Sequence, residues 1–364
     1  MVTPEFINII DTPEFQRLHW IGQLGLCHMV FPGATHTRFQ HSLGTMHIAD
    51  QMGEKLGSSH KKELMASALL HDVGHFPFSH SFEDYFKDNF NMDHEKVSRE
   101  IIMGKRGSGQ ITDALIKAGI SPESVCSILS KSGEFPLEES IVSGPIDSDE
   151  IDYLARDSYF TGVNLLPFDF RRIVSVLMKR DGVIYIESKG IPAIESLLIS
   201  RFLMYKSVYF HKTVRIIQKM ISRAIDNAKP GVESIRMNDG QFFDLIRNGG
   251  GDSIVERVSK RDLVKLVAQH EISDINQLNS LERVINEEFP DAYTDVVPPF
   301  SFRDYDRVKN RILVKLGSHF TDIRDLSPLL KSLYDSFNMR KVLIYGDQRR
   351  NNSINRIIEE FFSS

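Results

Sequence analysis

Apolar residues recur at intervals of three and four through most of the first 230 positions, which is the spacing of helices with one buried face. The predicted helix starts, in chain order, are Asp11, Arg38, Lys61, Ser79, Asp93 and Ile146. The run Asp11-Thr-Pro-Glu has the cap residue and first-turn proline that favour a helix start, and we expect this helix to reach about Gly25. The helix from Lys61 is expected to end at His71. The pattern therefore predicts a mostly α-helical protein.

The rest of the chain is more mixed. The helical spacing continues from Pro192 to about Ala228, which predicts one long helix, and Asp181-Gly182 between apolar residues predicts a small hairpin. Further predicted elements are helices at 241–247, 252–269, 275–287 and 352–362, and strands at 311–316 and 341–345. We therefore expect a catalytic core over residues 1–230 and a C-terminal helical and α+β region over residues 231–364.

Composition and charge narrow the class of protein. A chain of 364 residues with 41% hydrophobic and 26% charged residues has ordinary globular composition. Its net charge of -5 gives no global reason to expect nucleic acid or an anionic membrane as partner, although a local basic patch stays open. Cys27 and Cys126 form no CxxC pair, and no run of 18 apolar residues occurs. We expect a cytoplasmic protein that does not span a membrane.

Three histidines and an aspartate gather within ten residues after the helix from Lys61, at His71, Asp72, His75 and His80. Gly74 and Pro77 would interrupt the helix and turn the later histidines back towards the first. A single buried histidine is more often structural, but this density favours a metal-assisted active site, because imidazole nitrogen and carboxylate oxygen both bind divalent ions.

A divalent ion in a set of two histidines and two aspartates is the chemistry that we expect. The candidate ligands are His41, His71, Asp72 and Asp149. Such a set leaves positions for water and a phosphate oxygen, and the ion would lower the pKa of its bound water. These ligands suit Mn, Fe, Ni, Zn or Mg, so the sequence does not choose among them.

Hydrolysis at phosphorus also needs an acid for the leaving oxygen. His80 is the candidate, oriented by Glu83 three residues later on the same helix face, with His75 and His94 stabilising charge on the phosphate. For His94 alone a helix cap is an equal alternative, and His36, His47 and His60 taken singly favour capping or surface positions.

Five sequence words in the same order resemble one branch of a known family. They are Phe15-Gln-Arg-Leu, Phe31-Pro-Gly-Ala, Arg38-Phe-Gln-His-Ser-Leu-Gly, His71-Asp-Val-Gly-His-Phe-Pro-Phe-Ser-His and Asp152-Tyr-Leu-Ala-Arg-Asp. With the metal set, they resemble the deoxynucleoside triphosphate triphosphohydrolases among the HD-domain metal phosphohydrolases, a branch that includes the vertebrate SAM-and-HD-domain enzyme. The resemblance covers about residues 5 to 225, and no SAM domain is present in it.

The resemblance implies a helical HD-domain fold with a small α+β C-terminal part. It implies water attack on the α-phosphorus of a dNTP, which releases a deoxynucleoside and triphosphate. Carried over by position, Gln23 and Leu24 face the sugar and Arg38 binds phosphate. The remaining implied nucleotide contacts are Tyr153, Asp157, Arg201 and Tyr209. A homo-oligomer, either dimer or tetramer, is expected because relatives assemble.

Two positions depart from the branch. Relatives commonly carry Lys or Arg directly after the metal-ligand Asp, whereas this chain has Glu150, whose charge would repel a triphosphate. Asp11 matches a residue that reads a regulatory guanine nucleotide, but the neighbouring Arg is replaced by His19, so we expect nucleotide activation to be absent or different. Glu150 favours one alternative, a nucleotidase or phosphodiesterase with the same chemistry. The other alternative is an inactive nucleotide or nucleic-acid binding module.

Overall fold

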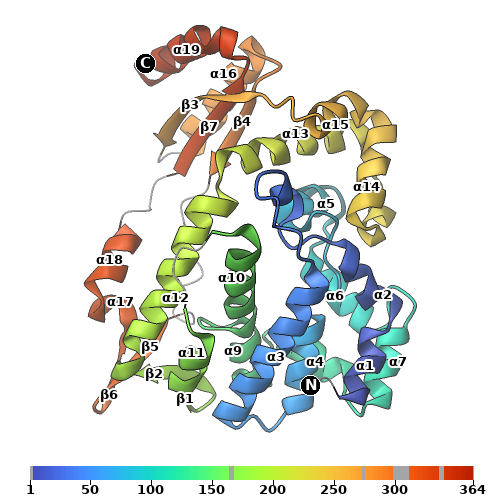
Figure 1. Ribbon diagram of the computed structural model, residues 1–364, viewed down its shortest axis with the longest axis vertical. Coiled ribbons are helices and arrows are strands. Elements are labelled where there is room, and N and C mark those ends of the chain that lie inside the picture. Colours follow the sequence, from blue (N-terminus) through green and yellow to red (C-terminus); the bar gives the residue numbers. More distant parts are fainter. Residues whose placement is uncertain (1–2, 164–167, 273–274, 298–310, 336–339, 364) are drawn as a thin grey trace. The chain divides into compact units, whose positions relative to one another are not determined.

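A computed structural model describes residues 3–163, 168–272, 275–297, 311–335 and 340–363 (Figure 1). The contacts divide the chain into two compact units. Unit 1 consists of Met1–Met204, Val232–Phe242 and Arg303–Lys331, and unit 2 of Tyr205–Gly231, Phe243–Phe302 and Ser332–Ser364. Each unit thus takes segments from both sides of residue 230. The division into a core of residues 1–230 and a C-terminal region of 231–364 stays a prediction.

The fold is mostly helical, as predicted, with a few short strands towards the C-terminus. The first helices are α1 (Pro4–Ile10), α2 (Pro13–Gln16), α3 (Arg38–Leu56), α4 (Lys61–Leu70), α5 (Glu83–Phe90), α6 (His94–Ile102), α7 (Gln110–Lys117), α8 (Pro122–Leu129), α9 (Pro136–Ser143) and α10 (Ser148–Thr161). The later ones are α11 (Phe170–Val176), α12 (Ile191–Met204), α13 (Lys212–Ala228), α14 (Asp239–Ile246), α15 (Asp252–Ser259), α16 (Ile275–Glu288), α17 (Ile323–Leu326), α18 (Pro328–Asp335) and α19 (Asn351–Ser363). No described helix is long and apolar enough to cross a membrane.

Helix α3 is the central element of unit 1, since both α4 and α10 pack against it (Figure 1). It begins with a capping box, in which the backbone N–H of Thr37 donates to Oε1 of Gln40, and it ends at Gly57 in the left-handed conformation. Buried Met52 and Leu64 belong to the core between α3 and α4, and each such side chain contributes about 1.5–3 kcal/mol on burial. The packing brings the first turns of α3 and α10 and the end of α4 together.

A small sheet completes unit 1. Its strands are β1 (Leu177–Arg180), β2 (Val183–Glu187), β5 (Leu313–Leu316) and β6 (His319–Asp322), in that spatial order. The predicted hairpin is confirmed, because β1 and β2 pair antiparallel across Asp181-Gly182. Both turn residues have positive φ, as a type I′ hairpin turn requires. Strand β5 runs parallel to β2, as expected for a strand that arrives from a distant part of the chain.

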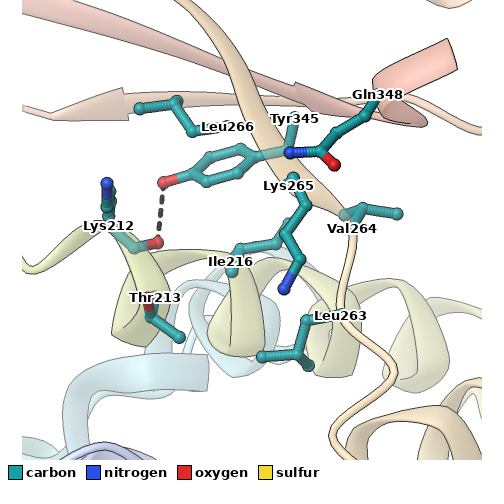
Figure 2. A pocket seen from close by; sticks show the side chains of 9 residues that line it. All are labelled: Lys212, Thr213, Ile216, Leu263, Val264, Lys265, Leu266, Tyr345 and Gln348. Carbon is teal, nitrogen blue, oxygen red and sulfur yellow. Dashed lines mark hydrogen bonds between the residues drawn. The ribbon is translucent and has the colours of Figure 1, made fainter.

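Unit 2 contains a second sheet with helices packed on it. Its strands β3 (Lys265–Ile272), β7 (Arg340–Gly346) and β4 (Tyr293–Val297) pair antiparallel, with β7 in the middle. Leu281 and Ile285 of α16 and Ile354 and Ile358 of α19 are buried with strand residues in one core. Figure 2 shows Tyr345, whose hydroxyl donates to the carbonyl oxygen of Lys212 at 2.9 Å in a pocket of about 180 Å³.

Three predicted helices differ from the structure. The segment from Asp11 forms only α2 and then a 3₁₀ turn at Arg17–Trp20. The long helix is divided into α12 and α13 by a wide π-type turn at Tyr205–Tyr209, after which Nδ1 of His211 accepts from the backbone N–H of Thr213 and caps α13. The helix expected over 252–269 ends at Ser259, because residues 265–272 pair with β7. The predicted strands near 311–316 and 341–345 and the final helix are confirmed.

Candidate metal centre and active site

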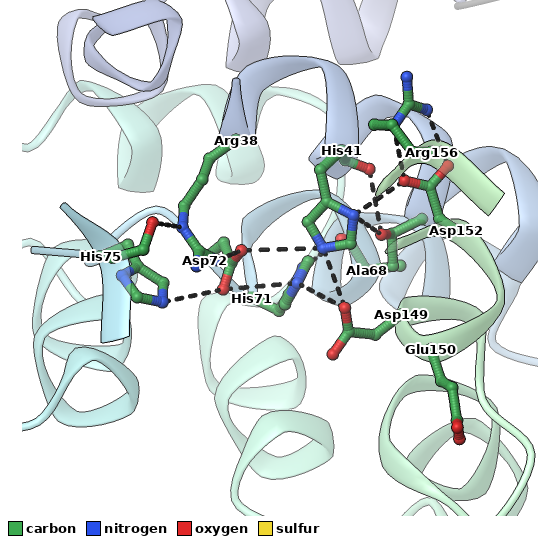
Figure 3. Close-up of polar contacts among 12 residues, drawn as sticks. Arg38, His41, Ala68, His71, Asp72, His75, Asp149, Glu150, Asp152 and Arg156 are labelled. Atoms are coloured by element: carbon green, nitrogen blue, oxygen red, sulfur yellow. Dashed lines mark hydrogen bonds and ion pairs between the residues drawn. The ribbon is translucent and has the colours of Figure 1, made fainter. Parts of the chain in front are cut away.

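The four predicted metal ligands come from three elements of unit 1 and lie together (Figure 3). His41 is in the first turn of α3, His71 and Asp72 follow α4, and Asp149 is in the first turn of α10. Oδ1 of Asp149 lies 2.9 Å from Nε2 of His41 and 3.6 Å from Nε2 of His71. The carboxylate of Asp72 lies 3.5 Å from His71 Nε2 and 3.8 Å from His41 Nε2. Ligand atoms of His41, His71 and Asp149 are all close enough to hold one ion.

The tautomers of both histidines fit metal binding. Nδ1 of His71 lies 2.8 Å from the carbonyl oxygen of Ala68, and Nδ1 of His41 lies 2.8 Å from Oδ2 of Asp152. Because these oxygens accept, each Nδ1 carries a proton, which leaves each Nε2 as the nitrogen that would bind an ion. Nε2 of each ring is buried and faces carboxylate oxygens of Asp149 and Asp72. Two buried nitrogens facing two carboxylates are a donor set that a divalent ion would satisfy.

A second layer of polar contacts orients His41. Asp152, on the next turn of α10, accepts from His41 Nδ1 and from Nε and Nη2 of Arg156 at 2.9 and 2.8 Å. A carboxylate on the far nitrogen of a metal-binding imidazole fixes the ring and raises its basicity. Gly44 makes room for this pair, because a Cβ at that position would overlap Oδ1 of Asp152.

The centre is strongly coupled electrostatically. Burial lowers the pKa of His41, but hydrogen bonds and charges from Asp149 and Asp152 outweigh it and raise the pKa to about 10. For Asp149, burial raises the pKa, and the contacts with His41 and His71 hold it well below its ordinary value. Burial likewise raises the pKa of Asp72, whereas Arg38 and the two histidines lower it. Both carboxylates are therefore ionised, as metal ligands must be.

A second group of titratable side chains adjoins the first through Asp72. Ligand atoms of Asp72, His75 and His94 lie close together, and the rings of His75 and His94 stack at 4.4 Å between centroids. Oε1 of Glu83 accepts from Nδ1 of His94 at 2.5 Å and from its backbone N–H at 3.0 Å. Burial lowers the pKa of His94, but the bond and charge of Glu83 raise it above its ordinary value. The side chain of His80, the predicted acid, lies outside the described residues.

Arg38, predicted to bind phosphate, is buried and holds other residues of the site. One of its Nη atoms donates to Oδ2 of Asp72, and its Nε donates to Oγ of Ser79 at 2.8 Å. Arg38 therefore connects a predicted metal ligand with Ser79, which lies between His75 and His80 in the chain. Its charge still lies beside the centre, where a phosphate would be bound.

The predicted sugar and nucleotide contacts fall into different surroundings. Gln23 is 9% exposed, its backbone N–H donates to the carbonyl oxygen of His36 at 3.0 Å, and among the described residues its Oε1 has no hydrogen-bond partner. Asp157 is 1% exposed and lies 2.7 Å from Nε2 of His36.

Other predicted nucleotide contacts are less buried. Leu24 and Tyr153 are half-buried. Tyr209 belongs to unit 2, where its ring packs edge-on against another tyrosine ring at 4.8 Å, so its nucleotide contact stays a prediction.

Glu150 does not face the metal centre. Its side chain is 7% exposed and points away from His41, His71 and Asp149 (Figure 3). Oε1 of Glu150 lies 3.1 Å from a guanidinium nitrogen of Arg201 on α12. The charge of Glu150 is thus paired with Arg201 and directed away from the centre, and its effect on triphosphate binding stays a prediction. The same pair occupies Arg201, which we had expected to contact the nucleotide.

Several residues of the site had no predicted role. Asp152 and Arg156 lie in one of the five sequence words, and their spacing of four residues indicates an ion pair on a helix. Nothing in the nearby sequence indicates that Asp152 also contacts His41. His36 could be found only through its buried contact with Asp157. Ser79 and Asp239 hold the loops of the site by backbone contacts, for which sequence carries no signal.

Two family models and several relatives match this chain. Residues 38–156 match the HD domain, and residues 168–363 match the HD associated region. An uncharacterized protein of Methanocaldococcus jannaschii, MJ1154, is 33% identical over 97% of this chain and 80% of its own length. YwfO of Bacillus subtilis, also uncharacterized, is 38% identical over 61% of this chain. Human deoxynucleoside triphosphate triphosphohydrolase SAMHD1 is 32% identical over 63% of this chain. The chain spans only 52% of YwfO and 43% of the human enzyme.

Solved structures resemble almost the whole chain. A hypothetical protein from Aquifex aeolicus has a TM-score of 0.80 at 29% identity, covering 97% of this chain and 95% of that one. A phosphohydrolase from Bacteroides thetaiotaomicron has a TM-score of 0.72 at 25% identity, covering 94% and 95%. With both matched regions and a converging set of histidines and aspartates, the chain belongs to the HD-domain phosphohydrolase family.

Proposed function

We propose that this phosphohydrolase cleaves dNTPs to a deoxynucleoside and triphosphate, using a divalent ion held by His41, His71, Asp72 and Asp149. The observation that carries the proposal is the convergence of these four side chains beside the group formed by His75, His94 and Glu83. When bound, the ion would activate water and screen the phosphoryl oxygens. The name of the human relative supports a dNTP as substrate.

The chain's own residues have distinct tasks in this reaction. Glu83 keeps His94 protonated to a higher pH than an ordinary histidine, so His94 can stabilise negative charge on the phosphoryl oxygens. His75 stacks on His94 and is proposed to contact the same phosphoryl oxygens. His80 remains the proposed acid that gives a proton to the leaving 5′-oxygen.

The surroundings of the Gln23 side chain support the proposal that a sugar binds in this site. Its buried Oε1 has no partner among the described residues, and a buried amide oxygen left without a donor is costly. A sugar hydroxyl is a donor of the right kind. Leu24 beside it offers an apolar surface, which would disfavour an additional 2′-hydroxyl because that group would lose its water without gaining a partner.

The second candidate is a nucleotidase or phosphodiesterase that uses the same centre. The observation in its favour is that Arg38 and Arg201 both pair with carboxylates, at Asp72 and Glu150. A monophosphate or diester needs fewer cationic partners than a triphosphate. An inactive binding module would have no need of the Glu83–His94 pair beside the ion site, so we place it behind both.

Product analysis tests the proposal. The purified protein, supplied separately with Mn²⁺, Mg²⁺, Fe²⁺, Ni²⁺ or Zn²⁺, is incubated with each dNTP, NTP and dNMP, and the products are separated by ion exchange. We expect equal amounts of deoxynucleoside and triphosphate from at least one dNTP. Release of orthophosphate from monophosphates, with every dNTP intact, would overturn the proposal in favour of the nucleotidase. Binding without turnover of any nucleotide would favour the inactive module.

Two variants show whether the activity belongs to this centre. His71→Ala should abolish both bound metal and turnover, because it removes a nitrogen that faces the other ligands. His47→Ala is the matched control, since His47 is exposed on α3 and its Nε2 lies 2.8 Å from the side-chain amide of Gln51, outside the metal centre. Retained metal in His71→Ala contradicts the ligand assignment. Assembly as a dimer or tetramer, a cytoplasmic location and altered nucleotide activation stay predictions.

A further inference from the structure

Asp239, at the start of α14, reaches two loops of the active site that lie far from it in sequence. Its Oδ2 accepts from the backbone N–H of Gly22 at 2.9 Å, and its Oδ1 accepts from the backbone N–H of Phe78 at 2.7 Å. Gly22 precedes Gln23 and Leu24, the residues expected to face the sugar. Phe78 lies between His75 and His80. One carboxylate therefore connects residues 22–24, which we call the sugar loop, with residues 75–80, which we call the histidine turn.

The histidine turn needs such a contact because its backbone is strained. Phe78 and Ser79 have φ values of 56° and 58°, in the left-handed region that residues with a side chain rarely adopt. Two consecutive residues of this kind persist only where the surroundings hold them. The bond from Phe78 N–H to Asp239 acts directly on the strained segment, and the aromatic side chain of Phe78 is itself buried.

A chain of hydrogen bonds runs from this turn to a metal ligand. Oγ of Ser79 donates to the carbonyl oxygen of Gly22 at 2.7 Å and accepts from Nε of Arg38 at 2.8 Å. Arg38 in turn donates to Asp72. The sugar loop, the histidine turn and the metal centre are thus parts of one polar network, to which Asp239 adds a second contact between the loop and the turn.

Arg17 ties the same C-terminal segment to the histidines by a second route. Its guanidinium donates to the carbonyl oxygens of Met237 at 2.9 Å and His75 at 2.5 Å, and more weakly to that of Val73 at 3.3 Å. Residues 237–239 therefore contact the segment 73–78 both through Arg17 and through Asp239.

We propose that Asp239 is a positioning residue, which fixes the sugar loop and the histidine turn relative to each other. Both turnover and selection of the deoxyribose would depend on that relative position. The proposal rests on the proposed function, since it presumes a sugar at Gln23. Asp239 acts through backbone N–H groups and does not itself touch the reacting atoms. Its loss should therefore change kcat and sugar selection while leaving the metal ligands intact.

The test compares Asp239→Asn with Asp244→Asn. Asn keeps one carbonyl oxygen but turns an NH₂ group towards the second backbone N–H, so two donors face each other. Asp244 is on the same helix with a side chain 71% exposed, so its variant is a matched control. We expect Asp239→Asn to bind metal as wild type, to lose about 10- to 100-fold in kcat, as small misplacements at active sites do, and to discriminate less between dNTP and NTP. Asp244→Asn should match wild type.

Hydrogen exchange supplies a readout that needs no substrate. In Asp239→Asn the amides of Gly22 and Phe78 should exchange at least about tenfold faster than in wild type, because one or both lose their acceptor. Faster exchange with wild-type kcat and wild-type sugar selection would overturn the positioning role. Unchanged exchange of both amides would overturn the contact itself.

Two precautions keep the outcomes separable. Should Asp239→Asn fail to fold, Asp239→Glu carries the same test, since it keeps the charge and both acceptor oxygens but displaces them by one methylene group from the N–H groups of Gly22 and Phe78. Should wild type release orthophosphate from monophosphates instead of triphosphate from dNTPs, the proposed function fails. The ratio of variant to wild-type kcat on that substrate, with the exchange data, then still decides whether Asp239 positions the turn.

Discussion

Asp152 offers the sharpest test of how the metal centre is built. Its Oδ2 lies 2.8 Å from Nδ1 of His41 and accepts from Nε of Arg156 at 2.9 Å, so replacing Asp152 frees the imidazole and leaves the guanidinium without its carboxylate. Outer contacts of this kind are worth about 10- to 100-fold in metal affinity. We therefore expect Asp152→Ala to weaken metal binding by that factor, or about 1.4–2.7 kcal/mol.

A series of variants separates charge from shape. Asp152→Asn can still accept from His41 but is neutral, and since charge-assisted bonds are about twice as strong as neutral ones, it should lose about half of that free energy. Arg156→Ala should lose less than Asp152→Ala, because the carboxylate keeps its bond with His41. Affinities are measured by competition with a chelator at fixed pH, with Glu54→Ala, an exposed change on α3, as control. If Asp152→Ala binds metal as tightly as wild type while His41→Ala does not, the reasoning is refuted.

Three further predictions concern separate contacts. Ala at a helical glycine usually stabilises by about 0.5–1 kcal/mol, but Gly44→Ala should lower both melting temperature and metal affinity, because its Cβ displaces the neighbouring carboxylate. Glu83→Gln removes the bond and charge that raise the pKa of His94, so the alkaline limb of the kcat profile should move to lower pH; an unmoved limb would contradict the assignment. Arg215→Ala leaves buried Asp295 without its bidentate partner and should cost about 3–5 kcal/mol by urea unfolding; a loss below about 1 kcal/mol would show that the pair is not structural.

Contacts within short segments were the predictable part of this site. The first turn of α3 and the end of α4 carry His41 and His71 in sequence words of their own, and Asp149 lies three residues before the word that begins at Asp152. These predicted ligands could therefore be selected before their contact was known. Helix caps such as Asp93, which accepts from the backbone N–H of Lys96, follow from the same local rules.

Long-range pairing accounts for what could not be predicted. Glu150 was assigned to the phosphates because it follows Asp149, yet on a helix neighbours point in directions about 100° apart, and packing turns Glu150 towards Arg201. The first part of β3, residues 265–269, lies within a predicted helix, because its residues suit either form and pairing with β7 decides between them.

The two family regions are interdependent within unit 1. The HD match ends at residue 156, but Glu150 inside it is paired with Arg201, and the strained Phe78 donates to Asp239, both from the HD associated region. An HD region without those partners would lose the guanidinium that faces buried Glu150 and the acceptor of the left-handed turn, and each loss disfavours the arrangement seen. The four predicted metal ligands all lie within the HD match, and the associated region is linked to the site through the contacts of Arg201 and Asp239. That region therefore contributes to the active site by shaping its loops.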